Sequence, residues 1–284
     1  MYKFALTGIS GYVAPRHIKA IYDTGNELVA ALDPHDSVGM IDKYFPDCDF
    51  FTEYERFDRH LEKLKRKGDP VNYISICSPN YLHDAHCRQA LRLGANAICE
   101  KPLVLNPWNL DQLTEIEKET GKKVYTILQL RLHPEVMKLK KEIDDSLHNV
   151  SIEYITPRGK WYDVSWKGDI QKSGGICTNI GIHLFDMLIW LFGNVIDYNV
   201  DVNEKKKIRG SLNLENAKVN WFLSTDQKDS KTPFRQIIID GKEVRLDKVF
   251  NDLHTESYKN ILSGNGSGIE EVKKSIELVY KLRS

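Results

Sequence analysis

The stretch FALTGISGYVA, residues Phe4–Ala14, decides how the first half of the chain folds. Its short apolar start predicts a strand, and a helical pattern of apolar residues begins at Ala14. Gly8 permits a tight turn, and Gly11 lets the backbone come close to a phosphate. We therefore predict a strand, a glycine turn and a helix whose free N–H groups can hold the phosphates of a dinucleotide.

A second signal for dinucleotide binding is an acidic residue. The next predicted strand, residues 28–32, ends at Asp33. A carboxylate there accepts hydrogen bonds from ribose hydroxyls and repels a 2′-phosphate, which favours NAD over NADP. The glycine pattern is GxxGxxA rather than GxGxxG. An ordinary strand–helix turn and an ordinary strand-end aspartate therefore stay open as alternatives.

Further strands and helices alternate up to about residue 128. Strands are predicted at 73–77, 97–99 and 124–128, and helices end at Gly94 and Gly121. This alternation predicts a parallel sheet covered on both faces, with ligands beyond the carboxyl ends of the strands. Polar residues that follow these strands, and that we expect to line one crevice, are Ser78, Asn80, Glu100, Lys101 and Gln129.

The second half of the chain is richer in strands. Apolar or alternating runs predict strands at 151–156, 195–202, 208–214, 219–224, 236–240 and 243–246, with a hairpin turn at Gly241-Lys242. Helices are predicted at 134–147, 180–191 and 269–282. The fold class is therefore α/β: a Rossmann doubly wound parallel sheet in residues 1–128, then an α+β domain with a largely antiparallel open sheet in residues 129–284.

Charge and composition exclude several classes of protein. Lysine plus arginine balance aspartate plus glutamate, 40 against 40, so we expect no nucleic-acid or anionic-membrane partner. The apolar run at 180–192 contains His183 and Asp186 and is too short and too polar to span a bilayer. With no visible signal peptide, these features predict a cytoplasmic protein.

Cysteine and histidine spacing gives no sign of a metal site. The five cysteines are an odd number without a CxxC pair, which is typical of small buried residues in a reducing compartment. The nine histidines show no HxxxH or HExxH spacing, so no metal is predicted.

Residues 158–172 combine cations with aromatic rings. They contain Arg158, Lys160, Lys167 and Lys172, interleaved with Trp161, Tyr162 and Trp166. Arginine suits a carboxylate or phosphate, lysine supplies point charge, and the rings can cover a sugar face or a uracil. A solvated loop with structural tryptophans is the alternative interpretation.

Four motifs in order carry a family resemblance: Gly8-x-x-Gly11, Ser78-Pro79-Asn80-x-x-His83, Glu100-Lys101-Pro102 and Gly181-Ile182-His183-x-x-Asp186. Together they resemble the glucose–fructose oxidoreductase/inositol dehydrogenase (Gfo/Idh/MocA) family. Residues 129–134, 156–169 and 179–183 are similar to its branch of UDP-N-acetylglucosaminuronate 3-dehydrogenases (WlbA/WbpB type).

The resemblance implies roles for individual residues. NAD would be bound by Gly8, Ser10, Gly11, Tyr12, Val13, Asp33, Ser78, Asn80, His83, Glu100, Lys101 and Gln129. The substrate would be bound by Lys101, Arg131, Arg158, Lys160, Tyr162, Trp166, Lys167, Asn179 and His183. Lys101 and His183 would be catalytic, and a cis bond is expected before Pro102. Many relatives carry an acid four residues before the histidine, where this chain has Asn179, so we expect Asn179 to bind substrate by hydrogen bonds.

The resemblance also implies an activity: NAD-dependent oxidation of the C3 hydroxyl of UDP-N-acetylglucosaminuronate to the 3-keto sugar, in lipopolysaccharide O-antigen sugar biosynthesis, by a homodimer or homotetramer. Two alternatives stay open, a dehydrogenase of another sugar or polyol and a non-catalytic dinucleotide-binding regulator. The sequence leaves open whether Lys101 or His183 is the base, and how NADH is reoxidised.

Overall fold

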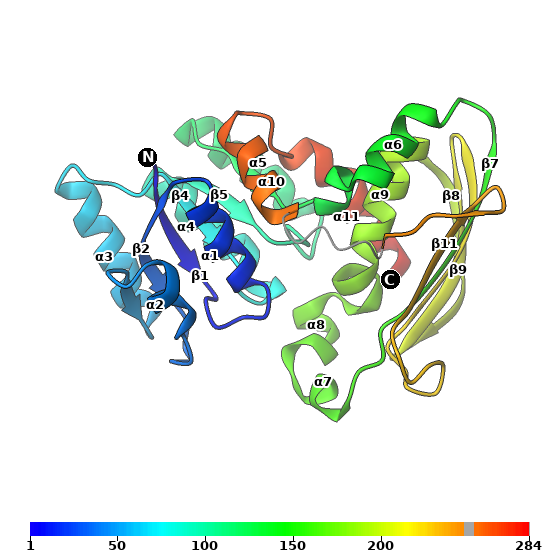
Figure 1. The fold of residues 1–284 in the computed structure, drawn as a ribbon, viewed down its shortest axis with the longest axis horizontal. Coiled ribbons are helices and arrows are strands. Elements are labelled where there is room, and N and C mark those ends of the chain that lie inside the picture. Colours follow the sequence, from blue (N-terminus) through cyan, green and yellow to red (C-terminus); the bar gives the residue numbers. More distant parts are fainter. Residues whose placement is uncertain (247–252, 284) are drawn as a thin grey trace. The chain divides into compact units, whose positions relative to one another are not determined.

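The computed structural model describes residues 1–246 and 253–283 and divides the chain into two compact units. The first unit consists of Met1–Ile127 together with α10 (Leu253–Leu262) and the chain that follows it to Val272. The second begins at Leu128 and includes α11 (Ile269–Arg283) from Lys273 onward. Figure 1 colours the elements of both units by their position along the chain.

A six-stranded parallel sheet forms the centre of the first unit. Its strands are β1 (Lys3–Thr7), β2 (Glu27–Leu32), β3 (Asp49–Phe51), β4 (Tyr73–Ile76), β5 (Asn96–Cys99) and β6 (Val124–Thr126). They lie in the order β3-β2-β1-β4-β5-β6, and every pair is parallel. The predicted doubly wound Rossmann sheet is therefore confirmed. Its strand order reverses between β1 and β4, which is where such sheets bind ligands.

The helices of this unit are α1 (Ala14–Asp23), α2 (Met40–Tyr44), α3 (Tyr54–Arg66), α4 (His83–Leu93) and α5 (Trp108–Thr120), with a 3₁₀ turn η1 (Asn80–Leu82). Both α4 and α5 end at the predicted glycines, Gly94 and Gly121, which have φ of 94° and 67°. Glycine reaches this left-handed conformation without strain and so ends each helix.

The domain boundary needs one correction. The sequence prediction assigned all residues after 128 to the second domain, but α10 packs in the first unit, against α1. Tyr258 of α10 is fully buried and its ring stacks on Phe4 of β1, with 5.9 Å between ring centroids. Ile261 belongs to the same apolar core. Apolar periodicity identifies the buried face of a helix but does not say which core that face joins.

The second unit is built on a mixed sheet of β7 (His148–Ile155), β8 (Val195–Glu204), β9 (Lys207–Leu214), β10 (Ala217–Ser224), β11 (Phe234–Ile239) and β12 (Lys242–Glu243). The order is β12-β11-β7-β10-β9-β8, and only β7 and β10 are parallel neighbours. The predicted largely antiparallel sheet is confirmed. Its last hairpin turns at Asp240-Gly241, with φ of 48° and 78°, one residue earlier than predicted.

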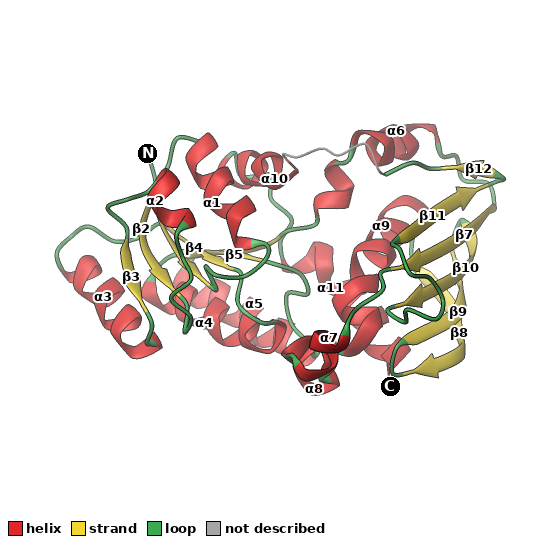
Figure 2. Cartoon of the chain, turned by 60° about the horizontal axis from the view of Figure 1, so that its bottom comes forward, coloured by secondary structure: helices red, strands yellow, loops and turns green. Residues whose placement is uncertain are grey.

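Helices cover one face of this sheet (Figure 2). The helices of this unit are α6 (Pro134–Glu142), α7 (Lys160–Val164), α8 (Ile170–Ser173), α9 (Ile182–Phe192) and part of α11, with short turns η2 (Gln129–Leu132) and η3 (Trp166–Gly168) and a π-helix η4 (Cys177–Gly181). By length and composition, the helical stretch Ile170–Phe192 could cross a membrane, and it is longer than the run the sequence analysis considered. Its most apolar window is 67% buried inside the protein, as in the core helix of a soluble protein.

Candidate functional site

The turn between β1 and α1 leaves no room for a side chain at Gly8 and little at Gly11. Gly8 has φ of 81°, and a Cβ atom there would lie 2.5 Å from the backbone of Cys77 and Ser78. Its amide donates to the carbonyl of Leu32 at 2.8 Å. A Cβ on Gly11 would lie 3.0 Å from the Gly8 carbonyl oxygen. The turn is thus pressed between the ends of β2 and β4, a cradle that a side chain would fill.

The charge pattern beside this turn fits a pyrophosphate and a ribose. No acidic residue occupies the first turn of α1, so its N-terminal partial positive charge is not neutralised locally. Asp33 is 5% exposed, and its two oxygens accept from the amides of Ser10, at 3.0 Å, and His35, at 2.9 Å. Tyr12 is 81% exposed and carries the guanidinium of Arg16 over its ring. These residues fit the adenosine diphosphate half of NAD.

The loop after β4 is tied to the loop after β5 by His83. The two nitrogens of this buried ring contact the carbonyl of Pro102, at 2.6 Å, and the carbonyl of Ser78, at 2.8 Å. Burial lowers the pKa of His83, whereas the two carbonyls favour a ring with a proton on both nitrogens. The Ser78 hydroxyl is 3.0 Å from Nδ1 of His86. Asn80 begins η1 and is buried.

Glu100 and Lys101 follow β5, and the Lys101–Pro102 bond is cis, as expected. The carboxylate of Glu100 is 6% exposed and has partners inside the unit. Its Oε1 is 2.9 Å from His17 Nε2 and 3.0 Å from His254 Nε2. These two histidines lie far from Glu100 in sequence, in α1 and α10, and no sequence motif identified them.

In the second unit, several predicted substrate residues come together. The amide of Asn179, in the π-helix, donates to the hydroxyl of Tyr162 at 3.3 Å. The ammonium of Lys167 lies 5.6 Å from the ring centroid of Trp161 and 5.4 Å from that of Trp166. Burial, and then the nearby charge of Arg158, lower the pKa of Lys167.

This segment has a surplus of positive charge. Asp163 pairs with Lys206 at 2.8 Å and with Lys205 at 3.8 Å, and Asp169 pairs with Lys172 at 3.8 Å. Over residues 1–246 and 253–283, no ion pair compensates Arg158, Lys160 or Lys167. Arg158 and Lys160 are exposed, and Lys160 is the first residue of α7. Cations beside aromatic rings form a surface suited to a charged sugar derivative.

Arg235 is a candidate that the sequence analysis missed. Its guanidinium lies over the ring of Tyr154, 4.9 Å from the centroid. Burial raises the pKa of Tyr154, and the charges of Arg235 and Arg158 act in the opposite direction. Arg235 therefore adds a cation to the positively charged group around Arg158, Lys160 and Lys167. Because β7 and β11 are far apart in sequence, only their pairing reveals it.

Arg131 has an internal partner in the structure. It holds Asp186 with two hydrogen bonds of 2.8 Å, and Ser275 donates to the same carboxylate at 3.2 Å. Burial raises the pKa of Asp186, and the bonds from Arg131 lower it. Two donors of the Arg131 guanidinium are thus already used within the protein. Its predicted substrate contact stays a prediction.

His183 lies in the first turn of α9, directly after the π-helix, and is partly buried. A Cβ on the preceding Gly181 would lie 2.7 Å from Leu223 of β10, so this turn packs closely on the sheet. Single π-turns inside helices are frequent at functional sites. Gln129 begins η2.

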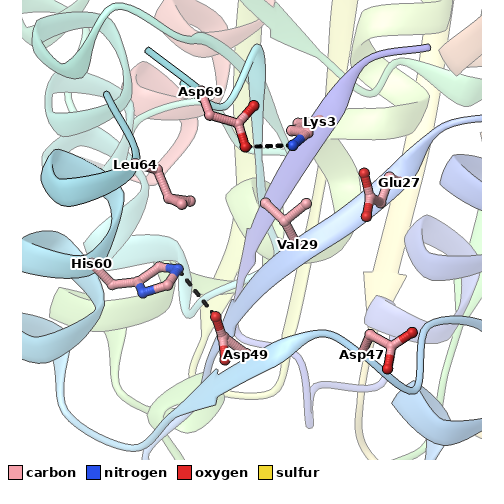
Figure 3. Close-up of a pocket in the computed structure, with 8 residues that line it drawn as sticks. All are labelled: Lys3, Glu27, Val29, Asp47, Asp49, His60, Leu64 and Asp69. Atoms are coloured by element: carbon pink, nitrogen blue, oxygen red, sulfur yellow. Dashed lines mark hydrogen bonds and ion pairs between the residues drawn. The ribbon is translucent and has the colours of Figure 1, made fainter. Parts of the chain in front are cut away.

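A pocket of about 170 Å³ lies elsewhere on the first unit (Figure 3). It is at the amino ends of β1, β2 and β3, opposite to the glycine turn, and is lined by Lys3, Glu27, Val29, Asp47, Asp49, His60, Leu64 and Asp69. Two of its carboxylates form ion pairs: Asp69 with Lys3 at 2.6 Å and Asp49 with His60 at 3.4 Å. None of its residues belongs to the predicted site.

Both halves of the chain match known protein domains. Residues 2–128 match the NAD-binding Rossmann fold of the Gfo/Idh/MocA oxidoreductase family, and residues 145–275 match its C-terminal α/β domain. The curated inositol 2-dehydrogenase of Rhizobium meliloti is 25% identical over 67% of this chain and 55% of its own length. The 2,7-anhydro-N-acetylneuraminate hydratase of Mediterraneibacter gnavus is 28% identical over 68% of this chain and 50% of its own length. The chain thus matches about half the length of these curated relatives.

A solved structure agrees over the whole chain. The WlbA (WbpB) dehydrogenase of Thermus thermophilus, in complex with NAD and UDP-GlcNAcA, is 48% identical and has a TM-score of 0.96. The match covers 100% of this chain and 95% of the other. With both domains matched in order and the glycine turn in place, the chain belongs to the Gfo/Idh/MocA oxidoreductase family, and its first domain is that family's NAD-binding Rossmann fold.

Proposed function

We propose that this protein oxidises the C3 hydroxyl of UDP-N-acetylglucosaminuronate with NAD, giving the 3-keto sugar. The observation that carries the proposal is the 48% identity, along the full chain, to a dehydrogenase solved with NAD and UDP-GlcNAcA. The cation–aromatic cluster of Arg158, Lys167 and Tyr162 supports it, because a UDP-uronate has both a diphosphate and a carboxylate.

The oxidation removes a hydride from C3 and a proton from its hydroxyl. Bound NAD would accept the hydride. Gly8, Gly11 and Asp33 would hold the adenosine diphosphate half, and Ser78, Asn80 and His83 would line the nicotinamide half. Lys101 or His183 would take the hydroxyl proton as a general base. Arg158, Lys160, Lys167 and Asn179 would bind the sugar nucleotide, with Tyr162 and Trp166 beside its rings.

Purified protein incubated with NAD and UDP-N-acetylglucosaminuronate tests the proposal. We expect NADH absorbance, or a bound 3-keto product by mass spectrometry. A parallel incubation with 2-oxoglutarate tests cofactor recycling, since the Thermus enzyme has also been solved with NAD and α-ketoglutarate. Turnover on a free sugar or on inositol, with none on the sugar nucleotide, contradicts the proposed substrate. Tight NAD binding without hydride transfer to any sugar nucleotide favours the non-catalytic regulator.

We further propose lipopolysaccharide O-antigen sugar biosynthesis in the cytoplasm as the setting. Nucleotide-linked uronates are precursors of such sugars, and this role rests on the proposed substrate. We also propose that the chain works as a homodimer or homotetramer.

A further inference from the structure

A chain of buried polar side chains runs through the first unit and ends at Glu100. The hydroxyl of Ser75 in β4 lies 2.6 Å from that of Tyr258, which lies 2.8 Å from Nδ1 of His17. His17 and His254 each place Nε2 at hydrogen-bond distance from Oε1 of Glu100, at 2.9 Å and 3.0 Å. None of the five side chains belongs to a residue that is more than 6% exposed. We call these residues the Glu100 network.

Donors and acceptors in the Glu100 network match in only one direction. An ionised carboxylate only accepts hydrogen bonds, so both histidines must carry a proton on Nε2. Nδ1 of His17 then accepts from Tyr258, and the Tyr258 oxygen accepts from Ser75. Burial raises the pKa of Tyr258 and lowers that of His17, which keeps both neutral. Burial would raise the pKa of Glu100, but the bonds from His17 and His254 hold it well below its usual range.

The other carboxylate oxygen of Glu100 connects the Glu100 network to the backbone of the predicted catalytic lysine. Oε2 accepts from the backbone amide of Lys101 at 3.3 Å. One oxygen is therefore held by two imidazoles, and the second holds the backbone from which the Lys101 side chain leaves. A displacement of about 1 Å at a reacting group can cost about a hundredfold in rate.

We propose that His17 and His254 are positioning residues for proton transfer: through Glu100 they fix the backbone of Lys101 and so aim its amino group. This inference rests on the proposed function, in which Lys101 acts on the substrate hydroxyl. It assigns a purpose to the return of α10 to the first unit, because α10 supplies both His254 and Tyr258.

A metal ion is the competing explanation for this cluster. One atom each from His17, Glu100 and His254 lies within 4.8 Å of the others, as in a three-ligand site. The two N–O distances, 2.9 Å and 3.0 Å, are ordinary hydrogen-bond lengths. Ligands about 2.0–2.1 Å from a tetrahedral zinc stand about 3.3 Å apart. The distances thus favour direct hydrogen bonds.

Paired substitutions at His254 test the positioning role. The Nε2–H of glutamine can replace that of histidine, whereas methionine has similar length and no donor. We expect His254→Met to lower kcat about tenfold or more, with the KM for NAD within about threefold of wild type. His254→Gln should recover most of the loss. Ser257→Ala, on the same helix, is the matched control and should leave kcat unchanged, because within the described residues the Ser257 hydroxyl donates only to the Leu253 carbonyl.

Two results from these variants overturn the proposal. One is a wild-type kcat in His254→Met. The other is an unchanged kcat with a raised KM for NAD, which would mean that the network holds the cofactor instead of the lysine. Elemental analysis of purified wild-type protein adds a third, because about one tightly bound zinc per chain would make the cluster a metal site.

Measurements on wild-type protein need neither a variant nor turnover. They therefore test the Glu100 network independently of the proposed substrate. Nitrogen-15 NMR should find a proton on Nε2 of both His17 and His254. Amide exchange at Lys101 should be slowed, by about tenfold or more, relative to an unstructured peptide. An unprotonated Nε2 on either ring, or an unprotected Lys101 amide, overturns the network even if the enzyme is active. Absence of turnover with both signatures present counts against the proposed function alone.

Discussion

Lys101 is the residue at which the proposed chemistry can be tested most directly. Lys101→Ala should lower kcat about 10²–10⁴-fold, the usual range for loss of acid–base catalysis. NAD affinity, measured by fluorescence titration, should stay near wild type because the glycine turn and Asp33 are intact. If Lys101→Ala keeps the wild-type kcat, the assignment is wrong, and His183→Ala becomes the variant expected to lose turnover.

Loss of the Arg158 side chain should weaken substrate binding instead of slowing turnover. If its guanidinium binds the carboxylate or a phosphate of the substrate, Arg158→Ala should weaken sugar-nucleotide binding by about 1.5–3 kcal/mol. Arg158→Lys should restore only part of this, since lysine lacks the planar fork. Calorimetric titration with UDP-N-acetylglucosaminuronate measures both. Lys172→Ala is the control, because Lys172 already pairs with Asp169. Equal affinities of Arg158→Ala and wild type would remove the physical support for an anion site here.

His86 should make the protein sensitive to acid. Burial, and then the nearby charge of His83, lower its pKa from 6.5 to about 4. The unfolded chain therefore binds a proton as pH falls below 6.5, while the folded protein does not. The stability contributed by neutral His86 is present above that pH and is lost as pH falls toward 4. The slope is about 1.4 kcal/mol per pH unit.

Urea unfolding of wild type and His86→Asn across this range measures the effect. Asparagine keeps an acceptor for Ser78 and Thr7, whose hydroxyls lie 3.0 Å and 3.1 Å from Nδ1, and it cannot titrate. We expect a shallower pH dependence of the free energy of unfolding in the variant. Identical slopes would show that His86 is not the titrating group.

Among the elements, the β1–α1 turn offers a matched pair of glycines. Gly8 and Gly25 both have positive φ, 81° and 70°, but a Cβ on Gly25 would meet nothing within 4 Å. Gly25→Ala should therefore cost only the strain of φ, about 1–2 kcal/mol. Gly8→Ala adds a clash with the backbone of Cys77 and should abolish NAD binding. Thermal unfolding and NAD titration of both variants check this. Retained NAD affinity in Gly8→Ala would contradict the cradle.

Other elements show why the sequence predicts some parts of the fold better than others. Strands β1, β4 and β5 were predicted within about one residue, because each is a buried apolar run that ends at a turn. Strand β3 was missed, since three residues give no period to read, and so was α3, whose exposed face is mostly charged. The last hairpin was misplaced by one residue, because Asp240 as well as Gly241 adopts positive φ.

For the molecule as a whole, the exposed face of the second sheet bears on assembly. Buried residues alternate with more exposed ones along β10, which puts Phe222 on the face opposite to the buried Trp221 and Leu223. The guanidinium of Arg209 lies over the Phe222 ring, 4.9 Å from its centroid. Aromatic residues and arginine are enriched at protein interfaces. Light scattering should give a mass of two or four times 32.7 kDa. Phe222→Glu should lower the mass, and Lys65→Glu, at an exposed position of α3 in the first unit, serves as the control. A monomeric wild type would refute the proposed oligomer.

Contacts between distant segments of the chain limit how much of the candidate site the sequence could predict. Motifs place Gly8, Asp33 and Lys101 because each follows a strand of one parallel sheet, and topology alone brings such ends together. His17, Glu100 and His254 meet only because α10 returns to the first unit. Arg235 joins Arg158 only because β11 pairs with β7. No local pattern encodes such long-range pairings.

The return of α10 also governs the order in which the protein can form during its synthesis. Residues 1–127 leave the ribosome before the second unit, yet the core around Phe4 lacks Tyr258 and Ile261 until residues 128–251 have also been made. Part of the apolar core of the nascent Rossmann sheet therefore stays exposed while the second unit is translated. Completion of the cofactor-binding half is therefore postponed until α10 has been translated, so a chain cut short before α10 lacks part of the core around β1.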